Sequence, residues 1–127
     1  MKFLFLFLAI LLSSPILKSQ GDELWVYFGT YTRGKDSEGV YSSKLNLKTG
    51  QLSKPVLAAK GDNPSFLTIL PNERYLIAVE ETNDYEGKAS GSVASYAINS
   101  TDGSLVLSDR VSTQGGAPCH ISADQAG

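Results

Sequence analysis

Short runs of apolar and branched residues, separated by polar turns, fill most of the chain after residue 20. Two runs are rich in aromatic and branched residues: LWVYFGTYT (24–32) and YLIAVEE (75–81). Two others alternate apolar with polar positions, as half-buried strands do: GVYSSKLNL (39–47) and SVASYAINS (92–100). No stretch in this part of the chain has a convincing helical period. The pattern therefore predicts an all-β fold of short strands.

Turn signals lie between these runs. Thr49-Gly50 and Asp102-Gly103 are hairpin signals, because glycine reaches positive φ without a Cβ clash. PNERY (71–75) follows the apolar run SFLTIL (65–70) and places Pro71 and Asn72 where turn residues belong.

The chain repeats itself with an offset of about 53 residues. KLNLKTGQL (44–52) lies on YAINSTDGSL (96–105), and Asn63 to Phe66 fall on Ala117 to His120. A repeat near 50 residues with about four strands is typical of a β-propeller blade, which buries its faces against neighbouring blades. By this alignment His120 occupies the place of Phe66, at the start of an innermost strand facing the central channel.

The first residues form a separate unit. Lys2, the apolar run 3–12 and Ser13-Ser14-Pro15 have the layout of a secretory signal peptide, and the run is shorter than the ~20 residues that span a bilayer. We expect residues 1–19 to be this leader and the protein to be exported, to the periplasm or the extracellular space.

Composition and charge limit the classes of partner that the protein is expected to bind. Of 11 basic residues, Lys2 and Lys18 belong to the leader, which leaves nine against 13 acidic residues. An acidic chain gives no electrostatic support for binding nucleic acid or, after leader removal, a membrane. The one cysteine cannot form an internal disulfide. The oligomeric state is not predicted.

Closed propellers have roughly four to eight blades, whereas residues 20–127 hold about two repeats. The chain stops at Gln125-Ala126-Gly127, just before the strand that follows PNE in the first repeat. We expect residues 20–127 to be the N-terminal part of a longer propeller, cut in mid-repeat and inactive alone. The alternative is a small β-sandwich with an exposed edge.

With these residues in place, the chain resembles the lactonase family of seven-bladed β-propellers, which includes the propeller-type 6-phosphogluconolactonases. The resemblance runs through YFGTYT (27–32), SEGVYSSKLNLKTGQL (37–52), NPSFLTILPNERYLIAVEE (63–81), GSVASYAINSTDGSL (91–105) and GGAPCHISADQAG (115–127). It implies hydrolysis of a sugar lactone at the central channel of the propeller, without a metal or organic cofactor. The rival hypothesis is a non-enzymatic exported propeller that binds a ligand or a protein, since one fold carries many functions.

The resemblance places two catalytic candidates. His120 matches the family's Pro-Cys-His motif, and a neutral imidazole can take a proton from water attacking a lactone carbonyl. Glu81 matches the acid that ends an Asn-Glu strand in the family, although this chain has Glu80 in place of the asparagine. Glu81 could orient His120, hold the attacking water or bind a sugar hydroxyl; a solvated strand end is the alternative.

Five further side chains are candidates for binding substrate because they offer polar groups beside the same strands: Thr30, Tyr31, Thr32, Asn63 and Ser65. Cys119 is expected in the packed layer rather than in catalysis, because neighbours in a strand face opposite sides. A calcium site formed by Glu80, Glu81, Asn83, Asp84 and Glu86 is a weaker alternative to exposed loop acids. Asn99-Ser100-Thr101 is a glycosylation sequon that has meaning only in a eukaryotic host.

Overall fold

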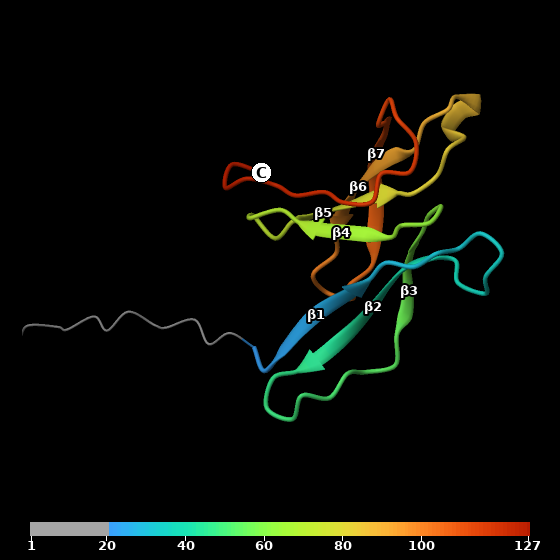
Figure 1. The fold of residues 1–127 in the computed structure, drawn as a ribbon. Helices are drawn as coiled ribbons and strands as arrows, with labels where there is room; N and C mark the ends of the chain where they lie inside the picture. Colours follow the sequence, from blue (N-terminus) through green and yellow to red (C-terminus); the bar gives the residue numbers. More distant parts are fainter. Residues whose placement is uncertain (1–20) are drawn as a thin grey trace, which may run out of the picture.

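The computed structural model describes residues 21–127, which form two antiparallel β-sheets (Figure 1). The predicted leader, residues 1–19, lies outside the described residues. Strands follow one another in each sheet in the order of the sequence, so each sheet is a meander of hairpins. No helix among residues 21–127 is long and apolar enough to cross a membrane.

The first sheet has three strands and the second has four. The strands of the first sheet are β1 (Glu23–Phe28), β2 (Gly39–Asn46) and β3 (Val56–Lys60). Those of the second are β4 (Phe66–Ile69), β5 (Tyr75–Glu80), β6 (Ser92–Ile98) and β7 (Leu105–Ser112), with a short 3-10 helix, η1 (Tyr85–Gly87), between β5 and β6.

The two sheets confirm the repeat read from the sequence. β5, β6 and β7 follow the order of β1, β2 and β3, and each copy has one register shift where its last two strands pair, between Val40 and Tyr41 and between Ser95 and Tyr96. The second sheet adds β4 on the free side of β5, whereas β1 has no neighbour in the corresponding place among residues 21–127. The second sheet is therefore one four-stranded blade, and the first is a blade with three of its strands.

The core lies between the two sheets. Val40 and Ala58 of the first sheet belong to one buried cluster with residues of the second: Leu76, Ala78, Ala94, Tyr96 and Leu105. Burial of these side chains supplies the main favourable free energy that holds the blades face to face. At the far end of the interface, the Trp25 indole N–H donates to the Ser100 carbonyl at 3.2 Å.

The predicted hairpin glycines are confirmed. Gly50 and Gly103 have φ of 72° and 71°, in the left-handed region that favours glycine. The first strand, β1, ends at Phe28, so the aromatic run continues beyond the strand, and Thr30, Tyr31 and Thr32 follow it. At Gly29 the backbone passes so close to Pro64 that a Cβ would lie 2.1 Å from the Pro64 carbonyl oxygen, and the chain leaves the sheet there.

The prediction that His120 begins a strand is wrong for these residues. Residues 113–127 contain no strand. A strand needs a row of backbone partners, and the hydrogen bonds of this segment go to loops instead: Ala117 N–H donates to the Thr82 carbonyl, and the Gly115 carbonyl accepts from Gly91.

Four connections meet at one end of the two sheets because the strands run antiparallel. They are residues 29–38 after β1, 61–65 before β4, 81–91 after β5 and 113–119 after β7. In Figure 1 they lie on the right of the view, opposite the hairpins at 47–55 and 70–74. This rim carries the side chains described next.

Candidate functional site

Glu81 is the centre of a small polar cluster at the rim. Its Oε2 accepts hydrogen bonds from the Ser65 hydroxyl at 2.6 Å and from the Tyr31 hydroxyl at 2.8 Å. These donors come from the starts and ends of different strands, since Ser65 precedes β4 and Tyr31 follows β1. Both donors bind the same oxygen. The other oxygen, Oε1, accepts no hydrogen bond from residues 21–127 and can receive a water or a ligand hydroxyl.

The cluster keeps Glu81 ionised. Hydrogen bonds from Ser65 and, to a smaller extent, Tyr31 hold the pKa of Glu81 below its ordinary value, against a smaller opposing effect of desolvation. The bond to Glu81 is also the main cause that raises the pKa of Tyr31, and desolvation adds to it. At neutral pH the pair is therefore a carboxylate and a neutral phenol, which suits Glu81 to accept hydrogen bonds rather than to donate a proton.

Asn63 connects Glu81 to the loop after β1. Its side-chain amide donates to the Glu81 carbonyl at 3.1 Å, and its carbonyl accepts from the Glu81 N–H at 3.0 Å. Its Oδ1 accepts from the backbone N–H groups of Thr32 at 2.8 Å and Arg33 at 3.0 Å. Asn63 also has a positive φ of 47°, in the left-handed region that asparagine enters more readily than most other non-glycine residues. Asn63 is thus a clasp between the two loops.

Among the sequence candidates, Tyr31, Thr32, Asn63, Ser65 and Glu81 come together. The Thr32 hydroxyl accepts from the Asn63 N–H at 3.0 Å, so Thr32 supports the clasp. Thr30 does not join them, because its hydroxyl donates to the Gly39 carbonyl at 2.6 Å and supports the turn into β2.

His120 lies beside β4 and is exposed. Its ring packs on Phe66 with a centroid distance of 4.5 Å and an interplanar angle of 47°. The contact joins the two positions that the sequence repeat had equated. No hydrogen bond connects His120 with Glu81 in residues 21–127.

The expected burial of Cys119 is wrong. The thiol is free and exposed, because the segment that carries it is not a strand with two distinct faces. Cys119 lies near Tyr31, and a charge on its sulfur is one of the smaller causes that raise the pKa of Tyr31.

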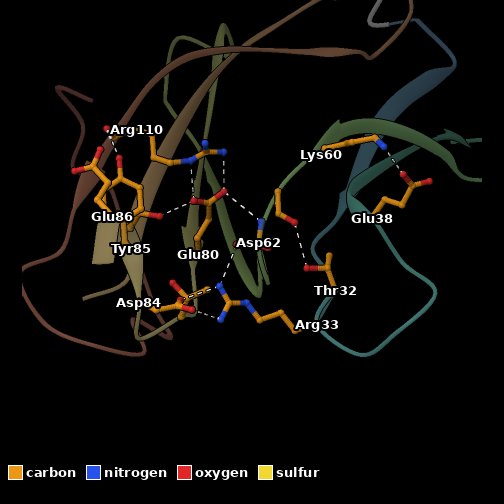
Figure 2. A pocket seen from close by; sticks show the side chains of 13 residues that line it. Thr32, Arg33, Glu38, Lys60, Asp62, Glu80, Asp84, Tyr85, Glu86 and Arg110 are labelled. Atoms are coloured by element: carbon orange, nitrogen blue, oxygen red, sulfur yellow. Dashed lines mark hydrogen bonds and ion pairs between the residues drawn. The ribbon is translucent and has the colours of Figure 1, made fainter. Parts of the chain in front are cut away.

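A polar cleft of about 730 Å³ opens between the two blades beside this cluster (Figure 2). Its floor holds Glu80, a carboxylate only 2% exposed. Arg110 of β7 approaches it with Nε 2.8 Å from Oε2 and Nη2 3.0 Å from Oε1, and the Ser92 hydroxyl donates to Oε2 at 2.5 Å. Burial raises the pKa of Tyr96, whose hydroxyl lies nearby, and the charge of Glu80 adds to this.

Arg33 closes one side of the cleft. Its guanidinium binds both carboxylate oxygens of Asp84 at 2.8 Å and reaches Asp62 at 3.1 Å. The hydrogen bond from Arg33 is the main cause that lowers the pKa of Asp84.

The acids considered as a calcium site are dispersed by these contacts: Glu80 faces Arg110, Glu81 faces Ser65 and Tyr31, and Asp84 faces Arg33. In the described part of the chain, no three His, Cys, Asp or Glu side chains are arranged to hold a metal ion.

Comparison with known proteins identifies the fold family. The profile of the family described as "Lactonase, 7-bladed beta-propeller" matches residues 25–127. This chain belongs to that lactonase family.

Relatives of this lactonase-family chain carry related names. It is 38% identical over 98 residues to a 6-phosphogluconolactonase of Bacillus subtilis, covering 77% of this chain and 26% of the relative. A second 6-phosphogluconolactonase, from Formosa agariphila, is 29% identical over 102 residues, or 80% of this chain and 28% of the relative. The chain therefore spans about a quarter of the length of these curated relatives.

Solved structures agree with the fold. A Bacteroides uniformis protein, provisionally assigned as a 6-phosphogluconolactonase, matches with a TM-score of 0.72 and 34% identity over 81% of this chain and 28% of that protein. A periplasmic gluconolactonase of Pseudomonas aeruginosa matches with a TM-score of 0.67 and 30% identity, over 76% of this chain and 26% of that one.

Sequence reasoning missed two features of this lactonase-family propeller. One is the ion pair of Glu80 and Arg110, which are 30 residues apart in the sequence. The other is the bridge from Arg33 to Asp62 and Asp84, in two other loops. The acidic residue at position 80, where the resemblance expects asparagine, was the one available signal, because a carboxylate at a buried strand end needs a cationic partner.

Proposed function

We propose that the protein to which this chain belongs hydrolyses a sugar lactone to the open-chain acid at the rim that carries Glu81. The observation that carries this proposal is the Glu81 carboxylate, ionised and held by Ser65 and Tyr31, with one oxygen open. Membership of the lactonase family and the names of the relatives support the same reaction. In this proposal Tyr31 and Ser65 lie beside the polyol together with Glu81. Thr30, Thr32 and Asn63 contribute by shaping the loops around it.

Two side chains divide the chemistry. His120 takes a proton from water as the water oxygen adds to the lactone carbonyl carbon. The tetrahedral intermediate then collapses, the bond between the carbonyl carbon and the ring oxygen breaks, and the protonated imidazole returns its proton to the departing ring oxygen. The products are a carboxylic acid and a free hydroxyl group. Glu81 orients the water or a sugar hydroxyl through Oε1. The reaction consumes one water and requires no metal or organic cofactor.

The same proposal includes the organisation of the chain. Residues 1–19 act as a signal peptide, and residues 20–127 form the N-terminal part of a longer propeller domain. Export fits a substrate that occurs outside the cytoplasm. The periplasmic gluconolactonase of Pseudomonas aeruginosa is a structural neighbour with such a location in its name, which favours an unphosphorylated lactone.

The test is hydrolysis by the purified full-length protein. Acid release from gluconolactone and from its 6-phosphate ester is followed at constant pH, with the spontaneous rate subtracted. We expect turnover of at least one lactone and a loss of roughly 10²–10⁴ in kcat for His120→Ala, the range that general-base catalysis contributes.

Glu81→Gln is expected to lower kcat/KM as well, because the amide keeps the shape of the carboxylate but loses its charge. The matched control is Glu23→Gln, which removes an exposed carboxylate bound to Lys44 in β2 and should leave the kinetics unchanged. Absence of turnover on both lactones would favour a non-enzymatic binding propeller. A fully active His120→Ala variant would remove His120 from the mechanism.

A further inference from the structure

The buried carboxylate of Glu80 has no part in the reaction proposed above, yet it lies next to Glu81 in the sequence. Glu80 ends β5 with its side chain in the interface between the blades, whereas Glu81 extends from the rim toward Ser65 and Tyr31. Figure 2 shows the Glu80 carboxylate between the Arg110 guanidinium and the backbone of the loop before β4. Burying a charge costs free energy unless the charge is paired and hydrogen-bonded. The presence of a carboxylate at this buried position therefore calls for an explanation.

Contacts with that loop suggest the reason. The Asp62 N–H points to Glu80 Oε1 at 3.4 Å, and the Tyr96 hydroxyl donates to the Lys60 carbonyl at 3.5 Å. The backbone at Gly61 passes so close that an added Cβ would lie 3.3 Å from both Glu80 Oε1 and the Tyr96 hydroxyl. Residues 60–62 therefore rest on a surface made of Glu80 and Tyr96.

The next residue of this loop is Asn63, the clasp that holds Glu81. Asn63 exchanges two hydrogen bonds with the backbone of Glu81 while it keeps a positive φ of 47°. Ser65, two residues further on, donates to the Glu81 carboxylate at 2.6 Å. Movement of residues 60–62 would thus be transmitted to Asn63 and Ser65, two of the three residues that hold Glu81.

We propose that the buried ion pair of Glu80 with Arg110 is a positioning element: it fixes the loop 60–65 and thereby the orientation of the Glu81 carboxylate. Arg110 acts through the hydrogen bond from Nη2 to Oε1 and the ion-pair contact of Nε with Oε2, and the Ser92 hydroxyl donates to the same carboxylate from β6. Neither Glu80 nor Arg110 touches the substrate in this proposal. The kinetic consequences of this inference rest on the proposed function. The effect on the orientation of the Glu81 carboxylate rests on the contacts described above and does not depend on that function.

The main test is Arg110→Met in the full-length protein, which keeps the apolar stem of the side chain and removes the cation. We expect kcat to fall about ten-fold, with KM changed less than about two-fold, because a small misplacement of a catalytic group lowers the rate without removing substrate contacts. As the loop relaxes, the hydrogen bond from Ser65 weakens. The pKa of Glu81, followed by NMR titration of its carboxyl carbon, should then rise by about half a unit, since that bond favours the ionised form of Glu81.

Controls separate positioning from mere stability. Leu105→Ala creates a cavity at the opposite end of β7 and should lower the thermal midpoint while leaving kcat and the Glu81 pKa unchanged at temperatures where the protein is folded. Arg110→Lys keeps a cation and should return most of the activity and the wild-type pKa of Glu81. If Arg110→Met loses stability but keeps the wild-type kcat and Glu81 pKa, the pair is only structural and the inference is wrong.

Two additional measurements keep the inference testable if activity or folding fails. Ser92→Ala removes a single donor to Glu80 without changing any charge, and it should raise the Glu81 pKa by a smaller amount; an unchanged Glu81 pKa contradicts the inference. Titration of the Glu81 carboxyl carbon by NMR needs no substrate. If the wild-type protein hydrolyses neither lactone, the proposed function fails, whereas a higher Glu81 pKa in the charge-neutral Ser92→Ala variant than in the wild type still supports positioning.

Discussion

The protonation state of Glu81 depends on the two side chains that donate hydrogen bonds to its carboxylate. A carboxylate at the end of a strand is ordinarily solvated, but here Ser65 and Tyr31 converge on one of its oxygens. Charge-assisted hydrogen bonds of this kind favour the ionised form. The sequence alone identified Glu81 as a candidate. Only the meeting of three loops at the rim brings both donors to one oxygen of its carboxylate.

Ser65→Ala tests the ranking of these donors. Because the Ser65 hydrogen bond is the largest cause that lowers the pKa of Glu81, its removal should raise that pKa toward the ordinary carboxyl value. Tyr31→Phe should raise it less. NMR titration of the Glu81 carboxyl carbon in the full-length protein measures both shifts, and a larger shift in Tyr31→Phe would reverse the ranking.

The sequence predicted the surroundings of His120 only in part. The repeat equated it with Phe66, and the structure stacks the two rings 4.5 Å apart. These equivalent positions of successive repeats are therefore neighbours beside β4. The strand predicted to start there is absent from residues 113–127, so both His120 and Cys119 are exposed.

Among the elements, hairpins were the most predictable because glycine fixes their geometry. Thr49-Gly50 and Asp102-Gly103 were both recognised as turns, and both glycines have positive φ. The lengths of strands were less predictable. The aromatic run extends from residue 24 to residue 32, but β1 ends at Phe28. The strand ends there because Pro64 approaches Gly29 closely, a tertiary contact that residue preferences for strands do not predict.

Gly50 and Gly103 form a matched pair for a test at this scale. An alanine at Gly50 meets nothing within 4 Å and should cost only the strain of a left-handed residue, about 1 kcal/mol. At Gly103 an added Cβ would lie 2.5 Å from the Trp25 ring, so Gly103→Ala must also displace that ring. We expect a total cost of about 2–4 kcal/mol there. Thermal unfolding of the two variants checks the difference, and equal midpoints would show that Trp25 moves without cost.

In the molecule as a whole, two sheets pack through one core, and several large apolar side chains stay exposed on the outer surfaces. Val106 is 62% exposed, Val56 54% and Val111 52%. The strand β1 also has a free edge among residues 21–127. Both features fit a family of seven blades and a chain that spans about a quarter of its relatives.

Segment 21–127, prepared alone, is therefore expected to self-associate, since open strand edges and apolar patches are sites of aggregation. Sedimentation velocity over a range of concentrations should show species larger than a monomer. A monomer with one cooperative unfolding transition would contradict this expectation and would support the self-contained sandwich that the sequence left as an alternative.

The sequence by itself determined the class of fold, the repeat and the turns, because alternation, glycine position and period can be read along the chain without tertiary contacts. The family followed from the resemblance of its motifs to those of known lactonases. The sequence also selected most members of the Glu81 cluster by their proximity to strand ends. Only the tertiary structure decided which candidates meet, that Asn63 clasps Glu81 and that Thr30 supports a turn instead. The pairing of Glu80 with Arg110 likewise depended on three strands coming together. The position of a charged residue in the sequence does not show which oppositely charged residue will lie next to it in the fold.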